Sequence, residues 1–218
     1  AEGDNPNRYR LSKQADVLML LYLLSAEELR AVLDRLGYLL PPEAVRRTVE
    51  FYGARTTHGS TLSRLVHSWV LGRSDRQASW SLFTRALDSD LADIQGGTTR
   101  EGVHIGAMAG TADMVLRCYA GLETRGDMLR LHPVLPAELP RAAFEIVYRG
   151  QPISVELTRE QVRLHLHPHI GDHVTVCIED QVSRLSSGDV HVVTLGLGSP
   201  IDHSGAQTDS EPTHLAPG

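Results

Sequence analysis

Long apolar runs, paired cysteines and an excess of basic charge are all missing from this sequence. Its most apolar stretch, residues 17–24, is far shorter than the roughly 20 residues that cross a bilayer. Only two cysteines occur among 218 residues, Cys118 and Cys177, with no CxxC spacing. We therefore expect a reduced, cytoplasmic protein with no membrane partner. A formal net charge of −6 provides no basic field for nucleic acid, so any anionic ligand must be held by local donors.

An initiating methionine and a recognisable signal peptide are also missing. The chain begins Ala1-Glu2-Gly3, which we interpret as a piece of a longer protein. Its length suits one large domain or two small ones, and its 41% apolar content is ordinary for a globular protein with a real core.

The first half of the chain has the hydrophobic spacing of helices. Ser12 and Ser74 are expected to cap helices, Ser25 and Glu28 to form a capping box, and Pro41-Pro42 to start a helix. The expected helices cover residues 12–24, 26–36, 42–52, 61–71 and 75–94, with a last one that follows the 95–99 loop and ends near residue 120.

From residue 129 to 195 the pattern changes to alternation of apolar and polar residues, as in Ile153, Val155 and Leu157. This predicts a small antiparallel β-sandwich after the helices. The fold class is therefore mainly α and then β, with a helical domain at 1–125 and a β domain at 126–195. Residues 196–218 contain little that could be buried and are expected to form a disordered tail.

His58, Gly59, Ser60 and Thr61, which we call the 58–61 loop, precede a helical stretch. Unpaired amides and the partial positive charge of a helix N-terminus favour an anion there. Gly59 would allow close backbone approach, the two hydroxyls would donate, and His58 could carry charge near neutral pH. The same residues are also typical of a plain helix cap, which leaves both interpretations open.

Three motifs occur in a fixed order: SKQADV at 12–17, THGST at 57–61 and DIQGGTTREGVHIGAMAGT at 93–111. Together with LHPVLP at 131–136 and FEIVYRG at 144–150, they resemble glycoside hydrolase family 65. That family contains inverting phosphorylases of maltose, trehalose, kojibiose and related α-glucosides. The resemblance covers nearly everything up to residue 195. It implies that 1–125 is the last part of an α/α barrel and 126–195 the C-terminal β-sandwich.

The resemblance also implies roles for the first two motifs. Lys13 and Gln14 match a pair that hydrogen-bonds the transferred glucosyl unit, for which an ammonium and an amide offer directional donors. Without the resemblance, they are ordinary residues of an exposed helical turn. The 58–61 loop matches the family's site for inorganic phosphate. Hydrolytic relatives carry a carboxylate base in this region, whereas no Asp or Glu lies between residues 51 and 72. That absence favours phosphorolysis.

The third motif predicts a close-packed loop that leads into a helix. Glu101 lies near the active-site side in the family, as a sugar ligand or as a charge that stabilises a helix N-terminus, and we leave both roles open. We interpret His104 as structural. Glycines recur at four-residue spacing and predict a smooth helix face for packing: Gly102, Gly106 and Gly110.

The family's general acid is a glutamate on an earlier barrel helix, and only Glu2 precedes Lys13. We therefore assign no catalytic residue and expect the chain alone to be inactive. The predicted function is that of a C-terminal portion of an inverting phosphorylase. It would cleave an α-linked glucosyl disaccharide with inorganic phosphate to give β-glucose 1-phosphate and a free sugar. A trehalase-like hydrolase and a non-catalytic sugar-binding fragment are the alternatives.

No organic cofactor or metal is implied, and the expected partners are disaccharide, phosphate and, since the family usually dimerises, a second copy of the intact enzyme. Alternating histidines could ligate zinc, but no cysteine or carboxylate completes a site, so a solvent-facing strand is preferred: His165, His167 and His169. We interpret Asp88, Asp90 and Asp93 as a solvated helix end.

Overall fold

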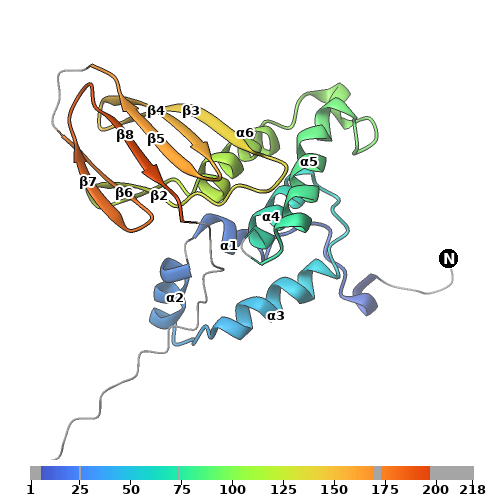
Figure 1. The fold of residues 1–218 in the computed structure, drawn as a ribbon. Helices are drawn as coiled ribbons and strands as arrows, with labels where there is room; N and C mark the ends of the chain where they lie inside the picture. Colours follow the sequence, from blue (N-terminus) through green and yellow to red (C-terminus); the bar gives the residue numbers. More distant parts are fainter. Residues whose placement is uncertain (1–5, 25, 73, 169–172, 197–218) are drawn as a thin grey trace, which may run out of the picture.

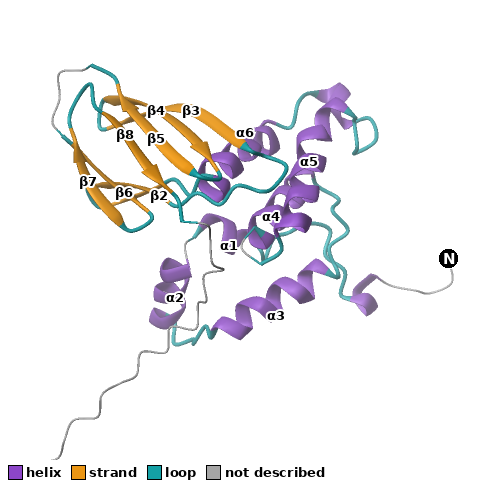
Figure 2. Ribbon diagram, viewed as in Figure 1, coloured by secondary structure: helices purple, strands orange, loops and turns teal. Residues whose placement is uncertain are grey.

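The computed structural model describes residues 6–24, 26–72, 74–168 and 173–196. Helices occupy the N-terminal part and two β-sheets the C-terminal part (Figures 1 and 2). The predicted fold class is confirmed, with helices followed by sheets in which antiparallel pairing predominates. Within the described residues, no helix combines the length and apolar character that crossing a membrane requires.

Six α-helices and three other helical turns make up the N-terminal part of the described chain. The α-helices are α1 (Met19–Leu23), α2 (Ala26–Arg35), α3 (Pro42–Gly53), α4 (Thr61–Leu71), α5 (Arg76–Leu91) and α6 (Ile105–Asp113). The turns are η1 (Pro6–Tyr9), η2 (Thr98–Glu101) and the π-helical η3 (Met114–Tyr119).

Several predicted helix boundaries need correction. The first helix begins at Met19 rather than after Ser12, because the backbone of Ser12 pairs with Thr56 in an isolated β-bridge. Asp75, not Ser74, caps α5, and its carboxylate accepts the amide of Ala78 at 3.0 Å. Pro42 begins α3 as predicted. The predicted capping box rests on Ser25, which lies outside the described residues.

The last predicted helix is divided, and its glycines differ in role. Gly102 precedes α6 with φ +139°, so it belongs to the loop and not to a helix face. A side chain at Gly106 would meet nothing within 4 Å, whereas a Cβ at Gly110 would lie 2.0 Å from Cδ2 of Leu65. Of the three glycines, therefore, only Gly110 provides a tight contact between helices, here α6 against α4.

Two four-stranded sheets follow the helices, in the orders β1-β2-β6-β7 and β3-β4-β5-β8. Along β4, buried and half-buried residues alternate, as the period of two predicts. One strand pair departs from the antiparallel expectation, since β2 and β6 run parallel with Leu129 opposite Val176. The strands are β1 (Glu123–Arg125), β2 (Met128–Leu131), β3 (Arg141–Tyr148), β4 (Gln151–Thr158), β5 (Gln161–Leu166), β6 (Val174–Ile178), β7 (Gln181–Leu185) and β8 (Val190–Thr194).

One hydrophobic core joins the helices to the sheets. Buried Leu65 of α4 and Met114 of η3 belong to the same cluster as Leu131 and Leu164 of the two sheets. This continuity fixes α4 and α5, which flank the 58–61 loop and the 95–99 loop, on a rigid base. The domain boundaries 1–125, 126–195 and 196–218 stay predictions. Strand β1 lies before residue 126 yet pairs with β2, and residues 197–218 lie outside the described residues.

Candidate functional site

The 58–61 loop ends where α4 begins, with Ser60 at the N-cap position. Ser60 has extended dihedral angles (φ −137°, ψ 140°), but its side chain makes no capping hydrogen bond. Ser60 therefore occupies the cap position through its backbone, while its hydroxyl is not engaged by its own helix. The Ser63 amide donates to the Ser60 carbonyl oxygen at 3.1 Å, whereas the amides of Thr61 and Leu62, at the start of α4, have no acceptor within the helix. Thr61 is buried, with 5% of its surface exposed.

Backbone hydrogen bonds join the loop to the segment that carries Lys13. The amide of Ser12 donates to Arg55 at 3.0 Å, the amide of Thr57 donates to Ser12 at 2.9 Å, and the amide of Gly59 donates to Lys13 at 2.8 Å. Two motifs that lie more than forty residues apart are thus brought side by side. The sequence predicted Gly59 as part of an anion site. Its amide is already bonded to the carbonyl oxygen of Lys13, so this amide does not serve as a donor for an anion.

Gly59 is instead required for the packing of Lys13. A Cβ at residue 59 would lie 2.9 Å from Cγ and 3.3 Å from Cε of Lys13, so the aliphatic part of that lysine crosses the glycine. Lys13 itself is exposed, as is Gln14. The amide nitrogen of Gln14 donates to Asp16 at 2.8 Å, which orients the Gln14 side chain before any sugar is bound.

His58 sits at the centre of a small polar cluster. Its backbone is in the left-handed region (φ +53°), and its Nδ1 lies 3.0 Å from Oγ of Ser63. Its ring meets the ring of His67 edge-on, with centroids 4.6 Å apart, and Nδ1 of His67 lies 2.9 Å from the Ser63 carbonyl oxygen. Neither Ser63 nor His67 was singled out from the sequence, although each lies on α4 at helical spacing from the other.

The electrostatics of this cluster correct the charge expected for His58. Burial, followed by the charges of His67, Arg64 and Arg85, lowers the pKa of His58 from 6.5 to about 4. His58 is therefore neutral near pH 7 when no anion is bound. In the tautomer whose Nδ1 accepts the Ser63 hydroxyl, Nε2 carries the proton and remains available as a neutral donor.

The glycine-rich motif reaches the same loop. Nε2 of Gln95 donates to the carbonyl oxygen of His58 at 3.2 Å. The carboxylate of Asp93 accepts the amides of Gly97 at 2.7 Å and Thr99 at 3.2 Å. Asp93 is therefore not simply a solvated helix end, because it fixes the turn that presents Gln95.

Asp90 is engaged in a similar way. One of its oxygens accepts the His104 amide at 2.9 Å, and the other lies 2.5 Å from Nδ1 of that residue. The contact with His104 lowers the pKa of Asp90. This pairing agrees with a structural role for His104 and corrects the interpretation of Asp90 as a solvated helix end. Asp88 remains exposed, as expected.

Glu101 is not joined to this cluster. It lies exposed in η2, and within the described part of the chain no hydrogen bond or ion pair connects it to the 58–61 loop. Its role as a sugar ligand stays a prediction. Among the same residues, no three His, Cys, Asp or Glu side chains are grouped as metal ligands. His167 contacts Ser154 at 2.6 Å, and His169 lies outside the described residues.

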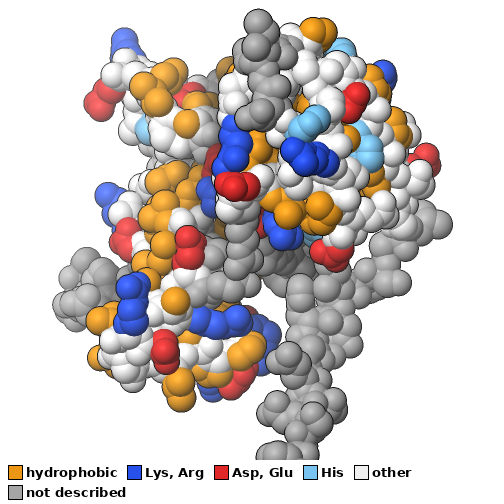
Figure 3. Space-filling model, turned by 90° about the vertical axis from the view of Figure 1, so that its left-hand side faces the viewer, with side chains coloured by type: hydrophobic (Ala, Val, Ile, Leu, Met, Phe, Trp, Pro, Cys, Tyr) orange, Lys and Arg blue, Asp and Glu red, His pale blue; other side chains and the backbone are white. Residues whose placement is uncertain are grey.

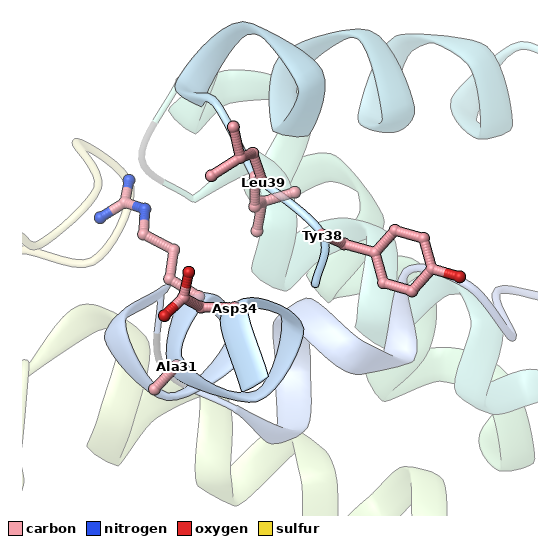
Figure 4. A pocket seen from close by; sticks show the side chains of 6 residues that line it. Ala31, Asp34, Tyr38 and Leu39 are labelled. Atoms are coloured by element: carbon pink, nitrogen blue, oxygen red, sulfur yellow. The ribbon is translucent and has the colours of Figure 1, made fainter. Parts of the chain in front are cut away.

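Two open pockets lie elsewhere. One, of about 320 Å³, is lined by Arg30, Asp34 and Tyr38 with their neighbours, and Figure 4 shows Asp34 and Tyr38 pointing away from each other. The other is lined by residues of α3, including Arg47 and Phe51. Neither contains a residue of the 58–61 loop. The hydrogen-bonded cluster, and not either hollow, is therefore the candidate site.

Comparisons with known proteins give this cluster a context. Residues 1–113 match the Glycosyl hydrolase family 65 central catalytic domain, and residues 122–185 match the Glycosyl hydrolase family 65, C-terminal domain. An uncharacterized glycosyl hydrolase of Mycobacterium tuberculosis is 46% identical over 196 residues, which is 90% of this chain and 15% of that protein. Trehalose 6-phosphate phosphorylase of Lactococcus lactis is 36% identical over 86% of this chain and 24% of that enzyme.

A solved structure assigned as a kojibiose phosphorylase, from the human microbiome, has the same fold. It superposes with a TM-score of 0.67 at 20% identity, over 85% of this chain and 22% of its own. The chain therefore spans less than a quarter of the length of each of these proteins.

Proposed function

Because this chain belongs to glycosyl hydrolase family 65, we propose that it forms the C-terminal portion of an inverting glycoside phosphorylase. The intact enzyme would cleave an α-linked glucosyl disaccharide with inorganic phosphate and release β-glucose 1-phosphate and a free sugar. Phosphorylases among the similar proteins support this reaction class, including enzymes that act on trehalose 6-phosphate, kojibiose and maltose.

The observation that carries the proposal is the hydrogen-bonded junction between Lys13 and Gly59. It places the proposed glucosyl ligands, Lys13 and Gln14, beside the proposed phosphate ligands, Ser60 and Thr61. Direct attack of phosphate on an anomeric carbon requires both reactants to be held close together and in line. A single rigid junction that carries both sets of donors meets this requirement.

In the proposed mechanism, first-turn amides of α4 and the hydroxyls of Ser60 and Thr61 hold phosphate oxygens. His58 donates from Nε2 as a neutral imidazole. A neutral donor orients the anion without transferring a proton to the attacking oxygen, which would weaken it as a nucleophile. Gly59 contributes by allowing Lys13 to pack against the loop.

The local carboxylates do not favour hydrolysis. Inversion with water needs a carboxylate base on the face where water attacks. No acidic residue occurs between residues 51 and 72, while Asp90 and Asp93 are bonded to His104 and to the amides of their own loop. Hydrogen bonds from the loop amides, led by that of Thr99, lower the pKa of Asp93, which makes it a weaker base. We therefore place hydrolysis second.

Several parts of the proposal concern the whole protein. The general acid would come from an earlier part of the polypeptide, so the 218-residue chain alone would be inactive. The sheets would support the barrel helices and take no part in the chemistry. No organic cofactor or metal is required, and we propose a cytoplasmic location and a homodimeric intact enzyme.

The test uses the full-length gene product that contains this chain. It is incubated with maltose, trehalose, trehalose 6-phosphate and kojibiose, with and without inorganic phosphate, and sugar phosphate is followed by phosphorus NMR. Phosphate-dependent formation of β-glucose 1-phosphate from one of them is expected. Release of glucose at the same rate without phosphate would identify a hydrolase. Sugar binding without turnover would identify a non-catalytic protein.

A further inference from the structure

Positive charge gathers beside the 58–61 loop without a carboxylate to balance it. Arg64 lies on α4, one residue after Ser63, and Arg85 lies on α5, which packs against α4 through paired hydrogen bonds between Ser68 and Ser79. Both guanidinium groups act electrostatically on His58, and Arg85 also acts on Arg64. In the described part of the chain, no ion pair involves either arginine.

The Arg64 side chain has a second unusual feature. Its Nη1 is shielded from solvent and has no hydrogen-bond partner among the described residues. A guanidinium nitrogen in this state has lost its hydration without compensation, which proteins rarely tolerate. Arg64 could have been paired with an acid on α5, but the residue placed near it is another arginine. No carboxylate of the described residues is paired with this guanidinium, so a bound anion could balance its charge.

His67 adds an independent observation on the same side of α4. Its side chain is 4% exposed, and its Nε2 has no partner, while its Nδ1 contacts the Ser63 carbonyl. Its ring packs edge-on against that of His58. Arg64 and His67, which are three residues apart on α4, thus each carry a buried nitrogen without a partner, and both act on the pKa of His58.

We propose that Arg64 and Arg85 form an anion subsite for a phosphate group next to the 58–61 loop. The inference rests on the proposed function, since it extends the phosphate site of that function by ligands outside the THGST motif. Two guanidinium groups match the charge of a phosphate dianion and can bind its oxygens in pairs. A neutral sugar hydroxyl would leave both charges uncompensated. The phosphate group belongs either to inorganic phosphate or to a phosphate ester of a sugar.

The test is isothermal titration calorimetry at low ionic strength on the full-length gene product that contains this chain. Orthophosphate and glucose 6-phosphate are titrated separately, with glucose as the uncharged comparison. The variants are Arg64→Gln, Arg64→Lys and Arg85→Gln, and the matched control is Arg163→Gln, which removes an exposed arginine from β5. We expect Arg64→Gln to weaken phosphate binding at least tenfold and Arg85→Gln about threefold, because Nη1 of Arg64 is buried, whereas Arg85 is exposed and its charge is screened by solvent. Arg163→Gln should stay within twofold.

The outcomes separate this inference from the proposed function. If orthophosphate binds and Arg64→Gln does not weaken it, the subsite is wrong, while the function can still hold. If only glucose 6-phosphate binds, in an Arg64-dependent way, the subsite is upheld for an ester, and the role of the loop in holding inorganic phosphate is contradicted. If neither ligand binds, the subsite is wrong, and phosphate-dependent turnover of the full-length protein decides the function by itself.

Thermal unfolding distinguishes a loss of phosphate binding in Arg64→Gln from a loss of fold stability. Because Nη1 of Arg64 is unpartnered, Arg64→Gln should leave the Tm without phosphate unchanged or raise it. Phosphate should raise the Tm of the unmodified protein and of Arg163→Gln but not that of Arg64→Gln. A lower Tm for Arg64→Gln and Arg64→Lys without phosphate would mean that Arg64 stabilises the fold, and would overturn the inference.

Discussion

At the scale of single residues, the charge of His58 decides how the site can act. The sequence indicated a histidine able to carry charge near neutral pH. The structure corrects this, because burial, followed by the charges of His67, Arg64 and Arg85, lowers the pKa of His58 to about 4. The THGST motif identifies His58, but it does not predict that Arg85 of α5 acts on the pKa of this histidine. Burial and long-range packing therefore set a property that spacing alone could not predict.

The lowered pKa of His58 predicts how stability depends on pH. In the unfolded chain His58 takes up a proton near pH 6.5, whereas in the folded protein it does so only near pH 4. The unfolded state then binds more protons between these values, so stability falls as the pH falls through this window. The pKa of buried His67 is lowered too and acts in the same direction.

The measurement is urea unfolding at several pH values between 7 and 4. His58→Gln should reduce the slope of unfolding free energy against pH, and His191→Gln, in β8, serves as the control. An unchanged slope in His58→Gln would contradict the burial of this imidazole in its neutral form.

Gly59 provides a second prediction at this scale. In Gly59→Ala the new methyl group must displace Lys13, whose Cγ lies 2.9 Å from the position of the added Cβ. We expect the KM for the sugar in the full-length enzyme to rise about tenfold, close to 1.4 kcal/mol. Gly53→Ala is the matched control, because a side chain there meets nothing within 4 Å. Equal KM values for the two variants would show that the packing of Lys13 does not matter.

At the scale of elements, local signals were reliable where no distant partner competed with them. Pro42 begins α3 because its fixed φ and missing N–H suit a first helical position. Ser12 failed as a cap because its backbone is bonded to Arg55 and Thr57, far along the chain. The parallel pairing of β2 with β6 depends on the arrival of a later strand, so no local pattern could predict it.

The contact between α4 and α6 yields a paired prediction. A methyl group at Gly110 would meet Leu65 at 2.0 Å, so Gly110→Ala should destabilise the protein by about 1–3 kcal/mol through overpacking. Gly106→Ala, one turn earlier on α6 and facing open space, should stabilise it by roughly 0.5–1 kcal/mol through helix propensity. Chemical denaturation measures both. A destabilised Gly106→Ala with a neutral Gly110→Ala would contradict the packing of α6.

At the scale of the whole molecule, the helical part leaves apolar side chains at the surface. Leu39 and Leu91 are each 89% exposed, and Figure 3 shows apolar side chains spread over one face of the molecule. Helices α2 and α3 lie well below the sheets in Figure 1, whereas α6 lies beside them. Exposed leucines of this kind favour association.

We therefore expect the isolated 218-residue chain to self-associate as its concentration rises, which sedimentation velocity measures. Leu39→Glu together with Leu91→Glu should shift the distribution toward monomer, and Thr48→Glu on α3 is the control for added charge. A monodisperse monomer at high concentration would contradict this expectation.

The site, too, was predictable only in part. The motifs at Lys13, His58 and Gln95 have the spacing of a known family, and the structure brings the three together through Lys13–Gly59 and Gln95–His58 hydrogen bonds. Arg64 and His67 lie outside the motifs that were recognised in the sequence. Their unpaired nitrogens become visible only once α4 is packed against its neighbours.

The central claim is that one junction holds phosphate on the 58–61 loop and the glucosyl unit on Lys13. The most direct measurement is steady-state kinetics of the full-length enzyme with phosphate and sugar varied separately, for Ser60→Ala, Lys13→Ala and the control Ser81→Ala on the exposed face of α5. The account predicts that Ser60→Ala raises the KM for phosphate and Lys13→Ala that for sugar, with Ser81→Ala unchanged. A raised KM for sugar alone in Ser60→Ala, or turnover that does not depend on phosphate, would contradict it.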